Sequence, residues 1–335
     1  MSHETGQDMK MIPCDLCGDK NYRILYVTKD RYFPIEGTFQ LVRCQNCGLL
    51  FLNPQPEAEE LQRHYPTECY YAYRSGKDAT NIVESEKLNL FRTIRAGLIG
   101  PLSRILPPLR SEMKKEMNHL GPIHYGMRVL DVGCGSGDSL SFYRERGAST
   151  FGVEINAQAC EEGRKKGHKM FCGELSEARF EEEFFEIVLF HHSLEHIFSP
   201  RLTLLEANRI LKRGGKVWIS VPNHRGVQAG IFGRWFYAIE SPRHLFGFTP
   251  TTAVRLLTQT GFQLEHIHTH SLPGGPCFSL EYFLNDHFSR PNPFYYDRIR
   301  IKWWYIVAEP LFFFPRLLIN LFNFGEILVF SGRKP

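Results

Sequence analysis

Two pairs of cysteines near the N-terminus have the spacing of metal ligands. Cys14 and Cys17 form one Cys-x-x-Cys pair, Cys44 and Cys47 form a second, and a glycine follows each pair. Thiolates bind zinc tetrahedrally, and four of them fill its coordination sphere, which makes such a site structural. The spacing therefore predicts a zinc ribbon over residues 1–55. A redox role for these thiols is the alternative.

A second group of residues combines glycines with a carboxylate. The segment 129–137 reads Val-Leu-Asp-Val-Gly-Cys-Gly-Ser-Gly, an apolar strand that runs into a tight turn. Gly133, Gly135 and Gly137 allow a ligand to approach backbone N–H groups closely. Glu154 closes the next predicted strand, where a doubly wound fold places the carboxylate that binds ribose hydroxyls. The pattern predicts a site for a nucleoside-containing ligand; a mere tight turn is the alternative.

Two aspartates in this region narrow the choice of ligand. A dinucleotide site requires a small residue at position 138, where Asp138 stands. Asp131, two residues before the first glycine, would repel a pyrophosphate. The position of Asp131 suits a ligand that carries an ammonium group.

Histidines follow the fourth predicted strand directly, in the run His-His-Ser-Leu-Glu-His over 191–196. Ligands of open α/β sheets bind at the carboxyl ends of strands. If a helical turn begins here, His192, Glu195 and His196 share one face. Histidine is suited to take a proton from a nucleophile near neutral pH. We expect a general base among these histidines; the alternative is that Glu195 and His196 only brace the sheet.

A second candidate group lies in the loop 241–250, which reads Ser-Pro-Arg-His-Leu-Phe-Gly-Phe-Thr-Pro. Arg243 and His244 are expected on the same rim as His192. A loop that only connects to the following helix is the alternative.

Strands that alternate with helices must position these residues. From residue 127 onward, five apolar strands are separated by helical patterns, one of which begins at Pro200 with Ser199 as its N-cap and ends at glycines 214 and 215. This order requires a parallel sheet with helices on both faces. The predicted strands are 128–132, 149–154, 168–172, 185–190 and 216–221, with two late strands at 262–269 and 326–331.

Composition divides the chain and limits its partners. We expect the ribbon at 1–55, a helical linker or lid at 56–120, and an α/β domain at 121–335 with an aromatic helical insertion at 272–324. The net charge of +4 and the absence of a long basic run argue against a dedicated nucleic-acid binder. No secretory signal begins the chain, so we expect a reducing, cytoplasmic location. The segment 303–322 is aromatic but interrupted by charges and prolines, so peripheral membrane contact is an alternative.

The segment 129–138 resembles motif I of the class I S-adenosylmethionine-dependent methyltransferases, and the resemblance extends from about residue 128 to 331. It implies a Rossmann-like seven-stranded sheet of order 3-2-1-4-5-7-6 with an antiparallel last hairpin. It also implies that the three glycines hold the methionine and ribose parts of the cofactor and that Glu154 binds the ribose. Glu174 is then expected near the adenine, and His191 beside the cofactor.

Further resemblances concern the acceptor. Glu195 and His196 match the Leu-Glu-His signature of small-molecule methyltransferases; related quinone-precursor enzymes bind a divalent metal in this region but carry Glu where His192 stands. The ribbon followed by Cys-Gln-Asn-Cys-Gly-Leu-Leu-Phe-Leu-Asn-Pro resembles bacterial methyltransferases of natural-product and surface-polysaccharide pathways. We therefore expect methyl transfer to a small-molecule, sugar or lipid-linked acceptor. The alternatives are an RNA methyltransferase that grips RNA with its ribbon and a non-catalytic cofactor-binding protein. The oligomeric state is not predicted.

Overall fold

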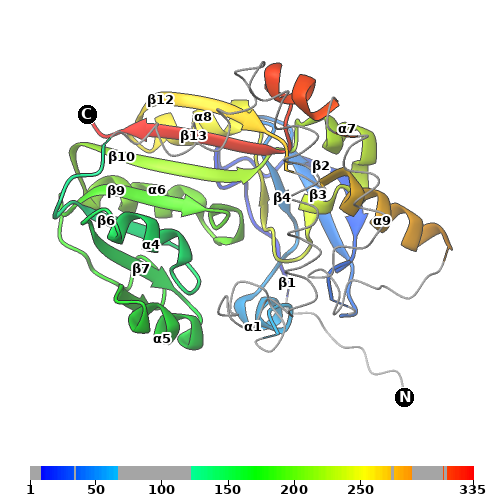
Figure 1. Ribbon diagram of the computed structural model, residues 1–335. Coiled ribbons are helices and arrows are strands. Elements are labelled where there is room, and N and C mark those ends of the chain that lie inside the picture. Colours follow the sequence, from blue (N-terminus) through cyan, green and yellow to red (C-terminus); the bar gives the residue numbers. More distant parts are fainter. Residues whose placement is uncertain (1–8, 34, 67–121, 273–274, 289–311, 313–314) are drawn as a thin grey trace, which may run out of the picture.

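The computed structural model describes residues 9–33, 35–66, 122–272, 275–288, 312 and 315–335 (Figure 1). Most of the predicted linker at 56–120 and of the insertion at 272–324 lies outside the described residues, as does most of the segment 303–322. Among the described residues, no helix combines the length and the apolar composition needed to cross a bilayer.

A seven-stranded, mostly parallel sheet forms the larger part of the molecule, which confirms the predicted α/β class (Figure 1). When the strands of this sheet are numbered by their order in the chain, their order in space is 3-2-1-4-5-7-6. The first five strands are parallel, and the last one in the chain pairs antiparallel with both of its neighbours. In spatial order the strands are β8 (Lys169–Cys172), β7 (Ser149–Glu154), β6 (Arg128–Val132), β9 (Phe185–His191), β10 (Leu211–Pro222), β13 (Ile327–Arg333) and β12 (Gln263–His270).

Helices cover both faces of this sheet because its strands alternate their side chains between two apolar clusters. Val129 packs in the cluster that contains Leu140 of α4, whereas Leu130 packs in the cluster that contains residues of α6 and α8. The helices that follow the strands are α4 (Asp138–Arg144), α5 (Ala157–Lys165), α6 (Pro200–Ile210), α7 (Val227–Phe232), α8 (Pro250–Gln259) and α9 (Gly275–Phe288).

Helix α6 begins at Pro200 after the N-cap Ser199, as predicted, but it ends earlier than predicted and is capped differently. It stops at Ile210 instead of continuing to the glycines, because Leu211 is already extended and pairs with Phe185 in the sheet. Its N-cap, Ser199, makes no side-chain capping bond. The Ser199 hydroxyl donates to Asp15 Oδ1 at 2.7 Å, and Asp15 Oδ2 accepts the Arg201 N–H at 2.9 Å. A residue between two of the N-terminal cysteines therefore caps a helix of the large sheet.

A second, four-stranded sheet contains the N-terminal residues but is not built by them alone. Its strands are β2 (Tyr22–Thr28), β3 (Phe39–Cys44), β4 (Leu50–Leu52) and β11 (Phe246–Gly247). The last of these comes from the loop before α8 and pairs antiparallel with β4. Strand β1 (Met9–Lys10) pairs with β5 (Gln55–Pro56), and helix α1 (Ala58–Arg63) follows. The domain boundary at residue 55 stays a prediction, but apolar packing is continuous across it.

Candidate active site

The glycine turn follows β6 and is joined to the end of β7. Gly133, Gly135 and Gly137 have φ values of 73°, 54° and 77°, a region that glycine adopts at little cost. The Gly135 N–H donates to Glu154 Oε2 at 2.9 Å, and the Asn156 N–H donates to Oε1 at 3.0 Å. Burial raises the pKa of Glu154, whereas these backbone donors lower it; the net direction is upward. The turn therefore holds the carboxylate in one orientation at the carboxyl edge of the sheet.

Asp131 is fully buried beneath the turn and has one oxygen without a partner. Its Oδ2 accepts the Ser139 hydroxyl at 2.5 Å, but Oδ1 has no hydrogen-bond partner within the described structure. Burial raises the pKa of Asp131 to about 7, and the nearby Glu154 charge adds to the increase. A buried acceptor without a donor is costly, so this oxygen fits a ligand that brings a donor or a positive charge.

We expect the Asp131→Asn variant to remove a pH-dependent cost to stability. Because the folded-state pKa is about 7 against an ordinary 3.8, the folded wild type loses stability as pH rises through that window. The free energy of unfolding of the variant, relative to wild type, should therefore rise by roughly 2–3 kcal/mol between pH 5 and pH 8. Urea unfolding of both cofactor-free proteins at the two pH values measures this. An identical difference at both values would contradict it.

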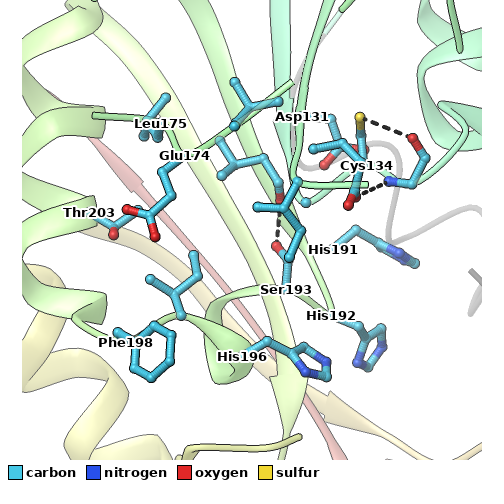
Figure 2. A pocket seen from close by; sticks show the side chains of 18 of the residues that line it. Asp131, Cys134, Glu174, Leu175, His191, His192, Ser193, His196, Phe198 and Thr203 are labelled. Atoms are coloured by element: carbon cyan, nitrogen blue, oxygen red, sulfur yellow. Dashed lines mark hydrogen bonds between the residues drawn. The ribbon is translucent and has the colours of Figure 1, made fainter. Parts of the chain in front are cut away.

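A cavity of about 910 Å³ opens at this edge of the sheet (Figure 2). Its lining combines the glycine turn with Glu154, Glu174, His191, His192 and His196. Apolar side chains line another part of it: Leu61 and Tyr65 at and after α1, and Ile197, Phe198 and Leu202 near the start of α6. The volume is in the range of pockets that hold a small molecule or a cofactor.

The predicted helical turn at the histidine run begins two residues later than expected. His192 has a φ of 52°, and a short 3-10 turn covers only Leu194–His196. His192 and Glu195 nevertheless meet: Nδ1 lies 3.5 Å from Oε1, which is longer than a well-formed hydrogen bond. The His192 Nε2 atom lies 3.3 Å from the Ser220 hydroxyl. His192 thus faces the cavity from the joint between β9 and the turn.

His196 is oriented by two groups at one nitrogen. Its Nδ1 lies 3.0 Å from the Arg243 carbonyl oxygen and 2.8 Å from the Tyr65 hydroxyl. A carbonyl can only accept, so Nδ1 carries the proton and Nε2 is left as the acceptor. Burial, followed by the charge of His244, lowers the pKa of His196 to about 4. The ring is therefore neutral at pH 7, with an available lone pair.

Glu195 and His244 lie behind His196 and do not line the cavity. The His244 ring packs edge-on against the His196 ring at 4.6 Å, and its Nδ1 donates to the Ala238 carbonyl at 2.7 Å. Glu195 is 1% exposed. Burial alone would raise its pKa, but the contact with His192 and the neighbouring histidines lower it to about 2. The donor atoms of Glu195, His196 and His244 lie within 4.8 Å of one another.

The structure also shows where His191 and Gly137 lie and which residues at the cavity were not predicted. The His191 ring stacks on Trp218 with centroids 5.6 Å apart, turned away from His196, although the residue lines the cavity (Figure 2). Gly137 is the N-cap of α4 and does not line the cavity. Tyr65, Leu61 and the apolar residues near α6 were missed, because no motif marks them and only the fold brings them to the cavity.

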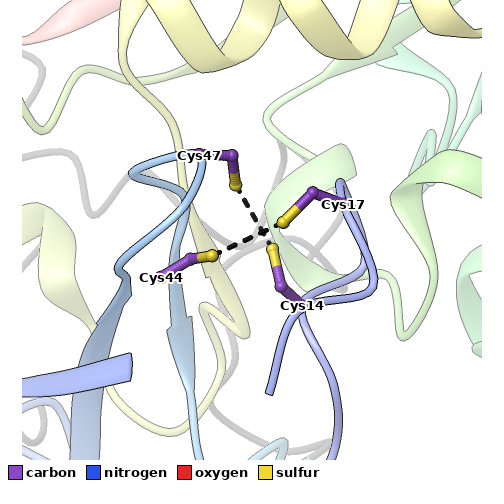
Figure 3. A group of neighbouring side chains, drawn as sticks. All are labelled: Cys14, Cys17, Cys44 and Cys47. Atoms are coloured by element: carbon purple, nitrogen blue, oxygen red, sulfur yellow. Dashed lines mark hydrogen bonds between the residues drawn. The ribbon is translucent and has the colours of Figure 1, made fainter. Parts of the chain in front are cut away.

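The four N-terminal cysteines converge as predicted by their spacing (Figure 3). The sulfur atoms of Cys14 and Cys47 are 3.4 Å apart, and those of Cys17 and Cys44 are 3.5 Å apart. All four sulfurs lie within 4.8 Å of one another. Tetrahedral thiolates at 2.3 Å from zinc would be roughly 3.8 Å apart. The residues therefore fit a four-thiolate metal site.

Comparison with known proteins agrees with this geometry. Residues 103–267 match the model of a methyltransferase domain family. The ubiquinone biosynthesis O-methyltransferase of Idiomarina loihiensis is 30% identical over 162 residues, which are 46% of this chain and 62% of that protein. The Escherichia coli enzyme of the same name is 23% identical over 239 residues, 61% of this chain and 95% of its own.

Structural likeness is more distant. The geranyl diphosphate C-methyltransferase of Streptomyces coelicolor superposes with a TM-score of 0.46 and 14% identity, over 67% of this chain and 79% of that one. The chain spans less than two thirds of the first relative named above. Its glycine turn, its sheet order and the match to a methyltransferase domain family together support a class I S-adenosylmethionine-dependent methyltransferase.

Proposed function

We propose that the cavity binds S-adenosylmethionine and that the enzyme transfers its methyl group to a small-molecule acceptor. The observation that carries the cofactor assignment is the unpartnered Asp131 Oδ1 beside Glu154. In this proposal Asp131 faces the ammonium group, Glu154 accepts from the ribose hydroxyls, and the glycine turn borders the methionine part. Glu174 lies near the adenine, and His191 lines the site through its position at the end of β9.

His196 supplies the base in this proposal. Bound S-adenosylmethionine provides a methyl group on a positively charged sulfur, which is a good leaving group. His196 Nε2 would take the proton of an acceptor hydroxyl held beside it, so that the hydroxyl oxygen could accept the methyl group while the neutral thioether leaves. Alignment of the two reactants and removal of the proton both lower the barrier. Glu195 and His244 support the ring from behind, and His192 completes the polar rim.

The acceptor class follows from the lining next to His196. Leu61, Ile197, Phe198 and Leu202 offer apolar surface, and Tyr65 and His192 offer polar groups at its edge. This combination favours an acceptor with an apolar body and an ionisable hydroxyl. The relatives named for ubiquinone biosynthesis are consistent with such a compound. Sugar and lipid-linked acceptors with an apolar portion belong to the same class.

Methyl-labelled cofactor distinguishes this acceptor class from RNA. Incubation of the protein with a cell extract and labelled S-adenosylmethionine should place the label in the small-molecule fraction. Label in nuclease-sensitive, acid-precipitable material would support the RNA alternative instead. No label in any fraction, despite cofactor binding, would favour a non-catalytic role.

We also infer that the four thiolates hold a structural zinc ion. The donor set is all sulfur and leaves no open position, so the metal would supply folding energy and no chemistry. Through Asp15, which caps α6, the metal-bound loop would secure the start of a helix that borders the cavity.

A further inference from the structure

A buried ionic cluster joins the N-terminal sheet to the loop before α8. Asp30 lies between β2 and β3, and Arg243 lies in the loop; the side chains of both are inaccessible to solvent. Arg243 Nη1 donates to Asp30 Oδ2 at 2.7 Å, and Nη2 donates to Oδ1 at 2.9 Å. The guanidinium Nε donates to Glu240 Oε1 at 3.2 Å. This two-pronged pairing fixes the guanidinium plane as well as its position.

The Asp30 side of the cluster is itself held rigidly. Oδ1 accepts the N–H groups of Tyr32 and Phe33, both at 2.9 Å, and His64 Nδ1 lies 2.8 Å from Oδ2. Although burial opposes ionisation, the Arg243 charge and these donors lower the pKa of Asp30. The carboxylate is therefore charged, and its position is set by the N-terminal segment.

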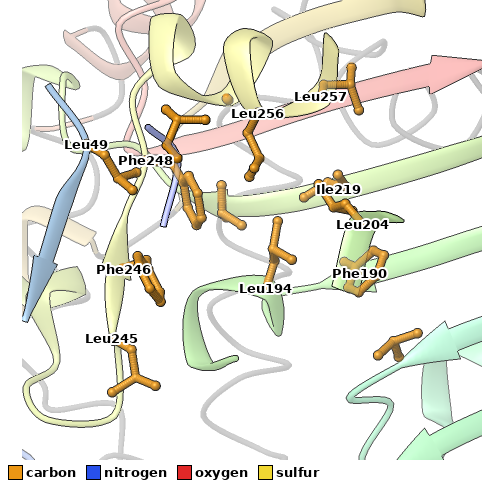
Figure 4. Packing of buried hydrophobic residues seen from close by; sticks show 14 of the residues in the cluster. Leu49, Phe190, Leu194, Leu204, Ile219, Leu245, Phe246, Phe248, Leu256 and Leu257 are labelled. Carbon is orange, nitrogen blue, oxygen red and sulfur yellow. The ribbon is translucent and has the colours of Figure 1, made fainter. Parts of the chain in front are cut away.

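The backbone of the Arg243 loop meets the histidine turn. The Arg243 carbonyl accepts the His196 Nδ1–H at 3.0 Å, and two residues later the Leu245 N–H donates to the Glu195 carbonyl at 2.8 Å. Leu245 and Phe246 lie on the loop that faces Leu194 (Figure 4). The Arg243 carbonyl sets the tautomer of His196, so a shift of this loop changes which ring nitrogen can accept a proton.

We propose that Asp30 is a positioning residue for methyl transfer, acting through Arg243 to hold His196 with Nδ1 protonated and Nε2 available. The inference rests on the proposed role of His196. It makes the N-terminal sheet part of the catalytic apparatus, although none of its strands lines the cavity. A shift of reacting atoms by an ångström costs about 100-fold in rate, so a distant clamp can affect catalysis strongly.

Other groups also face His196 and bear on its protonation. Tyr65 contacts Nδ1, His244 packs edge-on against the ring, and Glu195 and Glu240 contribute negative charge. Two groups contact Nδ1 itself, the Tyr65 hydroxyl and the Arg243 carbonyl, and the carbonyl can only accept a hydrogen bond. The carbonyl therefore determines the tautomer, and the Tyr65 hydroxyl adapts to it.

The test compares the Asp30→Asn variant with a matched control. Asp286→Asn disrupts another aspartate–arginine pair, between Asp286 of α9 and Arg31 of the N-terminal segment at 2.9 Å, neither of which lines the cavity. We expect Asp30→Asn to lower kcat by at least about 10-fold, to leave the S-adenosylmethionine affinity within about twofold, and to shift kcat along the pH axis. The control should leave all three unchanged.

Nitrogen NMR of histidine-labelled protein reads the tautomer directly, with the His196 signals assigned from their loss in His196→Gln. Wild type should show Nδ1 protonated, and Asp30→Asn should show a mixture. Wild-type rate and tautomer in a folded Asp30→Asn would overturn the proposal. If that variant does not fold, Glu240→Gln loosens the other anchor of Arg243 and must show a smaller change in the same direction.

Variants at His196 and at Asp30 distinguish a wrong base from a wrong positioning role. If His196→Gln itself retains activity, the proposed base is wrong. If His196→Gln is inactive but Asp30→Asn and Glu240→Gln both behave as wild type, only the positioning role is wrong.

Discussion

Replacement of His196 by glutamine should lower kcat for methyl transfer by at least about 100-fold while S-adenosylmethionine affinity stays within about twofold of wild type. Glutamine is polar and can form hydrogen bonds, but it lacks the basic nitrogen with which Nε2 would take up a proton. The cofactor groups proposed at Asp131 and Glu154 are untouched. Fixed-time assays with labelled cofactor measure kcat, and calorimetry measures the affinity for S-adenosylmethionine.

The pH dependence gives an independent check on the same residue. Because burial and His244 lower the pKa of His196 to about 4, the base stays neutral through the physiological range. The rate should therefore decline toward that value on acidification and not near pH 6.5. His124→Gln, which alters an exposed histidine before β6, is the matched control. Full activity in His196→Gln would remove this residue from the mechanism. Activity that requires added divalent cations would instead make Glu195, His196 and His244 a metal site.

The second large effect is expected from the Cys44→Ser variant, which should lose its zinc and melt at least about 5 °C lower. In the proposed site four thiolates bind the ion, so removal of one would open the site and weaken metal binding by the remaining three. Cys44 ends β3, and the proposed metal would link it to the loop that carries Asp15. Loss of the ion should therefore loosen both the small sheet and the start of α6. Elemental analysis and thermal unfolding measure the two effects.

Cys277→Ser is the control for this prediction, because Cys277 is equally buried but lies in α9 outside the cluster. It should keep one zinc per chain. A Cys44→Ser protein with full zinc content, or a wild type purified without any metal and with unchanged stability after zinc addition, would contradict the structural zinc site.

Much of the large sheet could be predicted because its parallel strands are buried on both faces. Such strands read as short apolar runs between turn residues, and β6 and β7 have the bounds that the runs predict. Helix ends were less predictable. Helix α6 stops where Leu211 joins the sheet, and its N-terminus is capped by Asp15 from a distant segment. Long-range partners of this kind leave no signal in the local sequence.

Part of the candidate site could likewise be predicted from the sequence, and part could not. The glycine turn with Glu154 is a local pattern, so the sequence alone could predict that these residues meet at the edge of the sheet. The orientation of His196 could not, because it depends on Tyr65 and the Arg243 carbonyl, 131 and 47 residues away. Arg243 was expected on the rim of the site, yet its side chain is fully buried against Asp30. The pairing of β11 with β4 and the contact between Arg243 and Asp30 bring these segments together.

The assignment of the cavity is tested by calorimetric titration with S-adenosylmethionine, performed on zinc-loaded wild type, on Glu154→Ala and on the partly exposed control Glu162→Ala. We expect binding to wild type and to the control, and roughly 100-fold weaker binding to Glu154→Ala, because two hydrogen bonds to a charged acceptor are lost. Well-folded wild type that does not bind the cofactor, or a Glu154→Ala variant that binds it as tightly as wild type, would contradict the assignment of the cavity.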